Sequence, residues 1–251
     1  MVSWFKKKRN TDKIIHPAMS HGTQRMLEDM AKEDEKMHDA IIRSNKPELK
    51  GLLPQPDWST VAEFERSIAE FFGAPYAVSV DSCTHGLELC LRYKEVEYIE
   101  VPKRTYLSIP VLAFKTGIDF DWGNITWEEA YWLNDLIIDA ATMWRKDSYQ
   151  HNTFMCLSFQ YQKHLSLGRG GMILCPDEQS YNQLKKMSYD GRLPGIPWRE
   201  QDIDTMGYHY YMTPETAALG LQKLPDAIAT PPRIWSYADY PDLTKMKLWA
   251  K

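Results

Sequence analysis

The sequence predicts an α/β fold in three layers, a mainly parallel sheet with helices on both faces. Two observations lead to this prediction. Short apolar runs of strand type alternate with amphipathic segments of helical period along residues 58–224, as in parallel sheets whose strands are joined by helices. Two of these runs, 136–138 and 154–159, carry or precede polar residues that could bind a ligand or catalyse a reaction. In α/β sheets, ligands bind at the carboxyl ends of the strands.

The expected elements follow the chain in order. Helices are expected at residues 61–72, 85–93, 108–116, 178–189 and 216–224, and strands at 74–80, 98–102, 118–122, 136–139, 154–159 and 171–174. The first helix places Val61, Phe64, Ile68 and Phe71 on one face. The last begins after Thr213, a cap followed by proline. Residues 171–174 could also return antiparallel, because the Gly-rich connection before them leaves little room for a crossover helix.

Composition excludes several classes of protein. The 251-residue chain has a formal net charge of -4, so nucleic-acid binding has no compositional support. No apolar run approaches the length of a bilayer and no apolar segment follows the basic residues 6–9, so we expect no membrane association and a cytoplasmic location. The four cysteines are widely spaced in apolar surroundings, which favours reduced core thiols over disulfides or a zinc site.

Two strand ends carry the residues with the clearest chemical potential. Asp139 follows the apolar run 136–138, and Lys163 lies five residues after Ser158 with a glycine cluster behind it. A lysine just past a strand end can bind an aldehyde cofactor covalently, and a carboxylate on a neighbouring strand can keep the ring nitrogen of that cofactor protonated. The pattern indicates a pyridoxal-phosphate (PLP) pocket. Taken singly, the same residues also fit a solvated lysine, a capping aspartate and a glycine-rich loop.

A third feature is a turn rich in hydroxyl groups between a strand and a helix. Ser82, Cys83 and Thr84 lie where the strand 74–80 gives way to the helix 85–93. Free N–H groups and the positive end of a helix favour an anion, so this turn is a candidate phosphate site. From spacing alone, Ser82 or Thr84 serving only as a helix cap is an equal alternative.

With these residues in place, the chain resembles the DegT/DnrJ/EryC1/StrS family of sugar aminotransferases, which have the fold-type I architecture of PLP enzymes. The resemblance covers roughly residues 58–224. Its anchors, in the order of the family, are the turn 82–87, the aromatic-bearing loop 102–106, the aspartate motif 138–141, the lysine motif 158–171 and the segment 207–221. One such match would be weak, whereas five in order are a specific signal.

The resemblance implies a role for each matched residue. Lys163 would hold PLP and later move a proton, with pyridoxamine phosphate (PMP) as the intermediate form of the cofactor. Asp139 would pair with the pyridine nitrogen. The phosphate would be held by Ser158 together with the turn residues Ser82, Cys83 and Thr84, and Tyr106 would stack on the ring, although a core or interface tyrosine is the alternative. His209 would reach the phosphate of a neighbouring subunit, which implies a homodimer with shared active sites.

Three departures from the family pattern accompany these matches. The position of His209 is usually Asn and that of Tyr211 is usually Arg, so a fixed charge is lost at the second position. Family members are also typically much longer. We therefore expect an N-terminal arm and helix in residues 1–57, the PLP-binding large domain in 58–224 and a short irregular tail in 225–251, with the small C-terminal domain largely missing.

The activity implied by the resemblance is transfer of an amino group from an amino acid, glutamate in the first place, to a nucleotide-linked keto-sugar. A PLP-dependent sugar dehydratase ranks lower, because the branch of the family with that chemistry replaces the lysine with histidine, and Lys163 is present here. A non-catalytic or partner-dependent shortened relative with a binding or regulatory role is the alternative from another class. The high content of Trp and Tyr, nine and fourteen residues, suggests an extensive interface or an aromatic-lined pocket.

Overall fold

The computed structural model describes residues 57–249. The helices are α3 (Trp58–Phe72), α4 (Cys83–Tyr93), α5 (Ser108–Thr116), α6 (Glu178–Ser188) and α7 (Pro214–Ala229), and the strands are β1 (Tyr76–Val80), β2 (Tyr98–Pro102), β3 (Asp119–Gly123), β4 (Tyr131–Trp132), β5 (Ile137–Asp139), β6 (Phe154–Ser158) and β7 (Gly171–Cys175). The predicted arm and the helix within residues 1–57 lie almost wholly outside the described residues. Most predicted elements lie within two residues of the observed ones.

The central sheet has five strands in the order β1-β7-β6-β5-β4. The pair β5·β6 is parallel, whereas β7 is antiparallel to both β1 and β6, and the two-residue strand β4 is antiparallel to β5. Strands β1, β5 and β6 therefore share one direction, and β2 and β3 form a separate parallel pair. The predicted α/β class is confirmed and its sheet is mixed, because β7 makes the antiparallel return that its short connection favoured.

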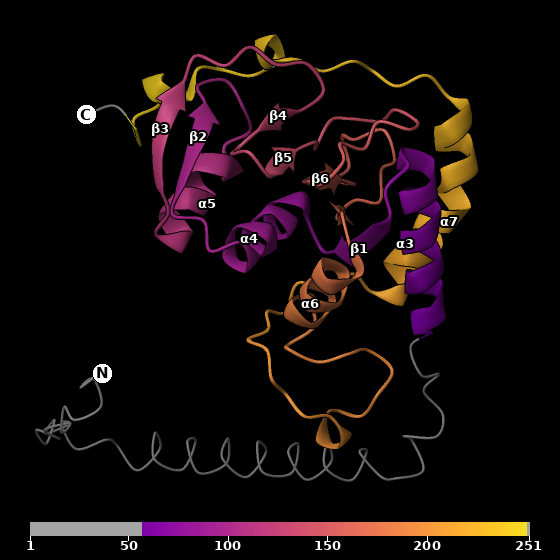
Figure 1. Cartoon of the computed structure of the whole chain (residues 1–251). Coiled ribbons are helices and arrows are strands. Elements are labelled where there is room, and N and C mark those ends of the chain that lie inside the picture. Colours follow the sequence, from indigo (N-terminus) through magenta and orange to yellow (C-terminus); the bar gives the residue numbers. More distant parts are fainter. Residues whose placement is uncertain (1–56, 250–251) are drawn as a thin grey trace, which may run out of the picture. The chain divides into compact units, whose positions relative to one another are not determined.

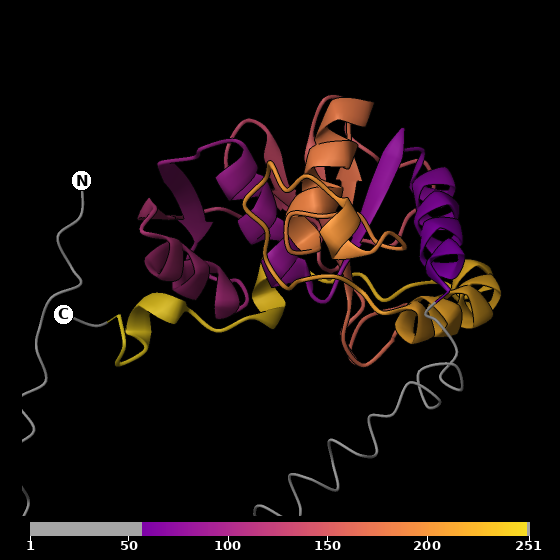
Figure 2. The ribbon, with the colours of Figure 1, turned by 90° about the horizontal axis from the view of Figure 1, so that it is seen from below.

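The sheet is packed on both faces. In β6, Cys156 faces one apolar core, while Met155 and Leu157 face the other, as the alternation of side chains along a strand requires. Helices α4, α5 and α6 contribute to the first core and helices α3 and α7 to the second. The two groups lie on opposite sides of the sheet (Figure 1). The view from below separates them in the same way (Figure 2), so the three-layer prediction is confirmed.

Helix boundaries follow from local chemistry, with one difference from the sequence prediction. Asp57 caps α3 by accepting a hydrogen bond from the backbone N–H of Ser59, and Gly73, with φ of 74°, ends the helix. Helix α7 continues through Pro225 to Ala229, so the predicted helix end at residue 224 is wrong. Leu224 and Ala227 are buried in the second core, and this packing outweighs the hydrogen bond that the proline removes.

Gly171 allows the first residue of β7 to approach the turn before α4. A Cβ atom at this position would lie 2.5 Å from the backbone of both Ser82 and Cys83. We expect Gly171→Ala to lower the free energy of unfolding by about 3 kcal/mol, because backbone cannot move aside as a side chain can. Gly117→Ala is the control, because nothing lies within 4 Å of a Cβ added at this position. The positive φ of residue 117 alone makes the alanine cost about 1 kcal/mol. Urea denaturation of both variants measures the difference, and equal stability would contradict this packing.

The four cysteines are all free and buried, as predicted. None of the helices within residues 57–249 combines the length and the apolar character needed to cross a bilayer. The same part of the chain contains no group of three or more His, Cys, Asp or Glu side chains placed to hold a metal ion.

Candidate active site

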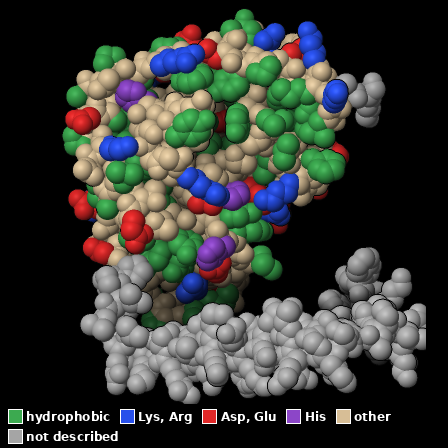
Figure 3. Space-filling model, turned by 180° about the vertical axis from the view of Figure 1, so that it is seen from behind, with side chains coloured by type: hydrophobic (Ala, Val, Ile, Leu, Met, Phe, Trp, Pro, Cys, Tyr) green, Lys and Arg blue, Asp and Glu red, His purple; other side chains and the backbone are tan. Residues whose placement is uncertain are grey.

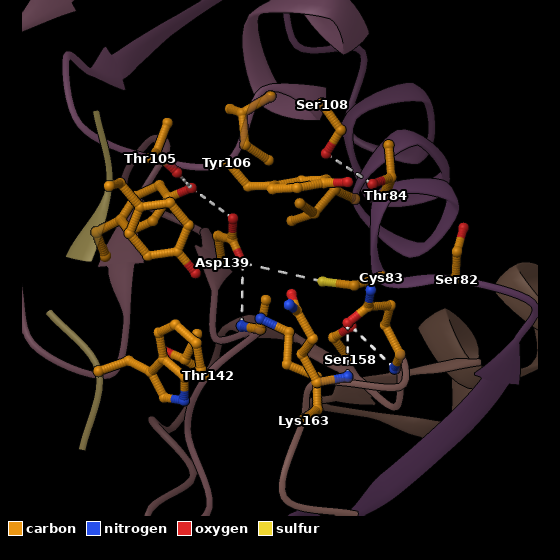
Figure 4. A pocket seen from close by; sticks show the side chains of 18 of the residues that line it. Ser82, Cys83, Thr84, Thr105, Tyr106, Ser108, Asp139, Thr142, Ser158 and Lys163 are labelled. Atoms are coloured by element: carbon orange, nitrogen blue, oxygen red, sulfur yellow. Dashed lines mark hydrogen bonds between the residues drawn. The ribbon is translucent and has the colours of Figure 1, made fainter. Parts of the chain in front are cut away.

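A cavity of about 450 Å³ opens at the carboxyl ends of β5 and β6. Every site residue predicted from the sequence except His209 lines this cavity: Ser82, Cys83, Thr84, Tyr106, Asp139, Ser158 and Lys163. They come from β5, β6, the start of α4 and the loops that follow β2 and β6, and the side chains converge on a common space (Figure 4). Residues separated by up to 81 positions in the sequence are thus brought together by the sheet.

Asp139 is the last residue of β5 and is 4% exposed. Its Oδ2 accepts a hydrogen bond of 2.5 Å from the Tyr131 hydroxyl, and its Oδ1 accepts one of 3.0 Å from the backbone N–H of Ala141. The thiol of Cys83 contacts Oδ1 at 3.9 Å. Burial raises the pKa of Asp139, and the bonds from Tyr131 and Ala141 and the positive charge of Lys163 only partly offset this effect. The positive charge and hydrogen-bond donors around the carboxylate therefore do not fully compensate for its burial.

We expect Tyr131→Phe to raise the pKa of Asp139 further, because the hydroxyl stabilises the ionised carboxylate. The acidic limb of the pH profile for cofactor binding should then move to higher pH. Titrating the visible absorbance of added PLP, the cofactor expected from the sequence, between pH 4 and 8 in wild type and variant measures the shift. Tyr161→Phe serves as an exposed control. An unchanged limb would show that the hydroxyl does not act on the carboxylate.

Lys163 lies in the turn after β6, where its backbone N–H donates to the Gln160 carbonyl at 2.8 Å. Burial lowers the pKa of its amine, and the nearby Asp139 and Cys83 raise it by less. Its Nζ lies 5.6 Å from the ring centre of Trp235. A partly desolvated lysine of this kind has a larger neutral fraction than a surface lysine, which is the form that can act as a nucleophile or accept a proton.

The turn before α4 forms another wall of the cavity. The Ser82 side chain caps the helix by accepting from the backbone N–H of His85 at 3.2 Å, and the Thr84 hydroxyl donates to that of Ser108 at 2.8 Å. The thiol of Cys83 turns inward to Asp139 (Figure 4) and contacts the Cys156 carbonyl at 3.3 Å. Ser82 therefore does cap the helix, which was the alternative to a phosphate-binding role. The first turn of α4 can still offer backbone N–H groups to an anion.

The chain matches the DegT/DnrJ/EryC1/StrS aminotransferase family over residues 31–119 and 141–230. It belongs to this family. The family is described as one of aminotransferases, and PLP is its cofactor.

One curated relative and two solved structures are also similar to this chain. The chain is 24% identical over 220 residues to the spore coat polysaccharide biosynthesis protein SpsC of Bacillus subtilis (strain 168), a match that covers 65% of this chain and 56% of SpsC. Its fold is similar to that of AtS13 from Actinomadura melliaura, with a TM-score of 0.60 and 21% identity over 69% of this chain and 61% of AtS13. The PLP form of the putative sugar aminotransferase Spr1654 from Streptococcus pneumoniae gives a TM-score of 0.57 and 17% identity, over 72% and 63% of the two chains. This chain therefore spans less than two thirds of each relative.

The residues of the cavity fit the cofactor of the family. None of the ion pairs between described residues includes Asp139, although its carboxylate is buried. A protonated ring nitrogen would supply the missing positive partner. The start of α4 offers N–H groups for a phosphate, and Lys163 lines the same cavity. This chain thus provides a carboxylate for the ring nitrogen, backbone N–H groups for the phosphate and an amine for the aldehyde.

Tyr106 lies at the mouth of the cavity, in the loop between β2 and α5. Its side chain is 62% exposed, and its ring lies close to Thr84 and Ser108 (Figure 4). The neighbouring Thr105 hydroxyl lies 2.5 Å from that of Tyr131. The position of Tyr106 suits a ring that covers a ligand, and its stacking role stays a prediction.

The structure does not bring His209 into this cavity. Its side chain is 72% exposed, and its Nδ1 lies 3.1 Å from a carboxylate oxygen of Asp190. The next residue, Tyr210, stacks on His85 with ring centres 3.7 Å apart and accepts a hydrogen bond at its carbonyl from the backbone N–H of Asp81. The segment 207–212 is therefore fixed against the turn before α4 while His209 faces outward.

Sequence reasoning missed many residues of the cavity wall, and four of them come from β4 and the C-terminal segment. Tyr131, in the two-residue strand β4, and Trp235, Asp239 and Tyr240, in the C-terminal segment, all line the cavity. A two-residue strand has no detectable period, and the C-terminal segment has the composition of a loop. The high aromatic content was the only signal, and it indicated an aromatic-lined pocket without placing it.

Proposed function

We propose that the chain is a PLP-dependent aminotransferase that binds PLP in the cavity at the ends of β5 and β6. The observation that carries this proposal is the convergence of Lys163, Asp139 and the start of α4 on one cavity within the family fold. The PLP and PMP forms of Spr1654 support the choice of cofactor. Adding PLP to the purified protein should produce visible absorbance that Lys163→Ala abolishes, and its absence in the wild type would end the proposal.

Each residue would bind a different part of the cofactor. Asp139 would hold the ring nitrogen in its protonated form, and the backbone at the start of α4 with the Ser158 hydroxyl would hold the phosphate. When bound, the cofactor supplies an electron sink. The amine of Lys163 would bind the aldehyde and then move a proton at its Nζ, a task for which burial has lowered its pKa.

We propose that the substrates are an amino acid, glutamate in the first place, and a nucleotide-linked keto-sugar. The support is the family and the names of similar proteins, polysaccharide biosynthesis for SpsC and putative sugar aminotransferase for Spr1654. Incubation with PLP, glutamate and a keto-sugar nucleotide, followed by mass spectrometry, should show an amino sugar. A deoxy sugar in its place would identify a dehydratase and overturn the transfer.

We also infer a homodimer in which His209 serves the cavity of the neighbouring subunit. The support is the outward position of His209 and the exposed apolar side chains of Leu107, Val111 and Phe114 at the start and along one side of α5. A mixture of Lys163→Ala and His209→Ala chains should regain part of the activity that each variant lacks, because mixed dimers contain one complete site. Light scattering that finds a monomer would contradict the inference.

The second candidate is a family member that binds cofactor without completing transfer. It is favoured by Tyr211, which packs between Trp58 and Tyr189 and leaves no fixed charge where the family usually has Arg. Bound PLP that no amino acid converts to PMP would support this candidate over the enzyme. For either candidate we propose a cytoplasmic location, supported by the four buried free thiols.

A further inference from the structure

A second cavity, of about 480 Å³, adjoins the first at Lys163. The two cavities share a wall that includes Lys163 and Trp235, and the second extends from there to Met143, His164 and Arg233. Lys163 therefore lies between the proposed cofactor cavity and a separate space of similar size. A molecule in that space would lie beside Lys163.

The two cavities differ in the sign of their charged residues. The first is lined by the carboxylates Glu129, Asp139 and Asp239 as well as by cations, whereas no Asp or Glu lines the second. The charged residues of the second cavity are Lys163 and Arg233, with His164 as a further nitrogen group. A concave site whose charged lining residues are all basic favours an anionic ligand, although Arg233 is also paired with Asp239.

Arg233 is held in place by two contacts. Its guanidinium carbon lies 3.8 Å from the ring centre of Trp235, and its Nη2 donates to Asp239 Oδ1 at 2.6 Å. Asp239 is itself fixed, because its Oδ2 accepts from the backbone N–H of Ser236 at 2.9 Å. The remaining N–H groups of the guanidinium have no acceptor within residues 57–249. An arginine oriented in this way presents a fork that matches the two oxygens of a carboxylate.

The segment that carries Arg233 is fixed across the mouth of the site. The backbone N–H of Glu129 donates to the Trp235 carbonyl at 2.8 Å, and that of Tyr237 donates to the Trp127 carbonyl at 3.0 Å. In Figure 1 this yellow segment runs from α7 past β6, β5 and β4 towards β3. It lies beyond residue 230, where the match to the family ends.

We propose that Arg233 binds the carboxylate of a substrate in the second cavity, with Trp235 and Asp239 as the residues that position its guanidinium. This inference rests on the proposed function, because it names the binding residue for the amino-acid donor. A carboxylate is favoured over the diphosphate of a nucleotide for a geometrical reason. In an amino acid the carboxylate is bonded to the carbon that carries the reacting amine, so it must bind in the cavity that Lys163 and Arg233 both line.

The first test uses protein without cofactor, so that its result does not depend on catalysis. The full chain is stripped of PLP and titrated with glutarate, a five-carbon dicarboxylate without an amine, by calorimetry. We expect wild type to bind glutarate and Arg233→Gln to bind at least about tenfold more weakly, the usual effect of losing a charge-assisted hydrogen bond. Arg233→Lys should bind with intermediate affinity, since it keeps the charge and loses the fork.

Arg199→Gln is the matched control, because Arg199 also stacks on a tryptophan, Trp198, at 5.4 Å, and does not line either cavity. It should bind glutarate as wild type does. Failure of wild type to bind glutarate, or equal binding by Arg233→Gln, would overturn the proposal. Uridine diphosphate is titrated in parallel, and a loss of its binding instead of glutarate binding in Arg233→Gln would also overturn it.

The second test separates this inference from the proposed function. With PLP bound, Arg233→Gln should raise the KM for glutamate at least about tenfold, while the cofactor absorbance that depends on Lys163 stays unchanged. Loss of that absorbance in wild type would instead refute the proposed function and leave the glutarate result standing. A normal KM for glutamate in the variant would refute the role of Arg233 alone. Thermal unfolding checks that the variant is folded.

Discussion

Lys163→Ala is expected to abolish amino transfer and to remove the visible absorbance of bound PLP. The amine is the nucleophile and the proton carrier of the proposed site, and it is held at the junction of two cavities. Loss of a positioned acid–base group slows a reaction by about 10²- to 10⁴-fold, and loss of the covalent link to the cofactor adds to this. Single-turnover conversion of PLP to PMP with glutamate, followed by absorbance, measures the effect.

Lys146→Ala is the control for this variant, because Lys146 is an exposed lysine in the loop after β5 that does not line either cavity. It should turn over as wild type does. Addition of a small amine should partly restore the absorbance change in Lys163→Ala, since the missing group is an amine. Full activity of Lys163→Ala would remove the basis of the proposed mechanism.

Asp139→Asn is expected to slow amino transfer by about 10²- to 10³-fold, the range found when a preorganised electrostatic partner is removed. An amide has nearly the same shape as the carboxylate and can still accept from Tyr131 or Ala141. It carries no charge, so the ring nitrogen would lose the group that keeps it protonated. PLP should still bind, and the rate of PMP formation should fall. A rate equal to wild type would show that Asp139 does not serve the ring.

The same substitution should stabilise the protein without cofactor at neutral pH. Burial raises the pKa of Asp139 above its ordinary value of 3.8, so the folded state holds the proton more tightly than the unfolded state does. The contribution of Asp139 to stability is therefore fully present below pH 3.8 and is lost as the pH rises through the raised folded pKa. Asp139→Asn removes this loss, so its free energy of unfolding in urea should exceed that of wild type at pH 7. The difference should shrink as the pH falls towards 4.

Asp139 and Lys163 could be predicted because their signals are local. Each lies at or just beyond the end of a short apolar run, and a strand within a covered sheet is recognisable from such a run. The sheet then places the ends of β5 and β6 side by side. The order of strands required the structure, because β7 lies between β1 and β6 and no local pattern encodes that insertion.

The remaining parts of the site depend on contacts distant in sequence. The direction of the Cys83 thiol is set by Asp139 and Cys156, which lie 56 and 73 residues further along the chain. Arg233 and Trp235 lie in a segment that looked irregular, and its position is fixed by backbone bonds to residues 127–129. Local propensity carries no information about such pairings.

The position of Tyr210 has a consequence for the proposed dimer. Its carbonyl and ring are attached to Asp81 and His85 beside the phosphate turn, and the adjacent His209 would serve the other subunit. If that turn moves when PLP binds to one subunit, Tyr210 would move with it. The adjacent His209, one peptide unit away, would then move in the active site of the second subunit. Cofactor uptake should then be cooperative, so that the affinity of the second subunit for PLP depends on whether the first is filled.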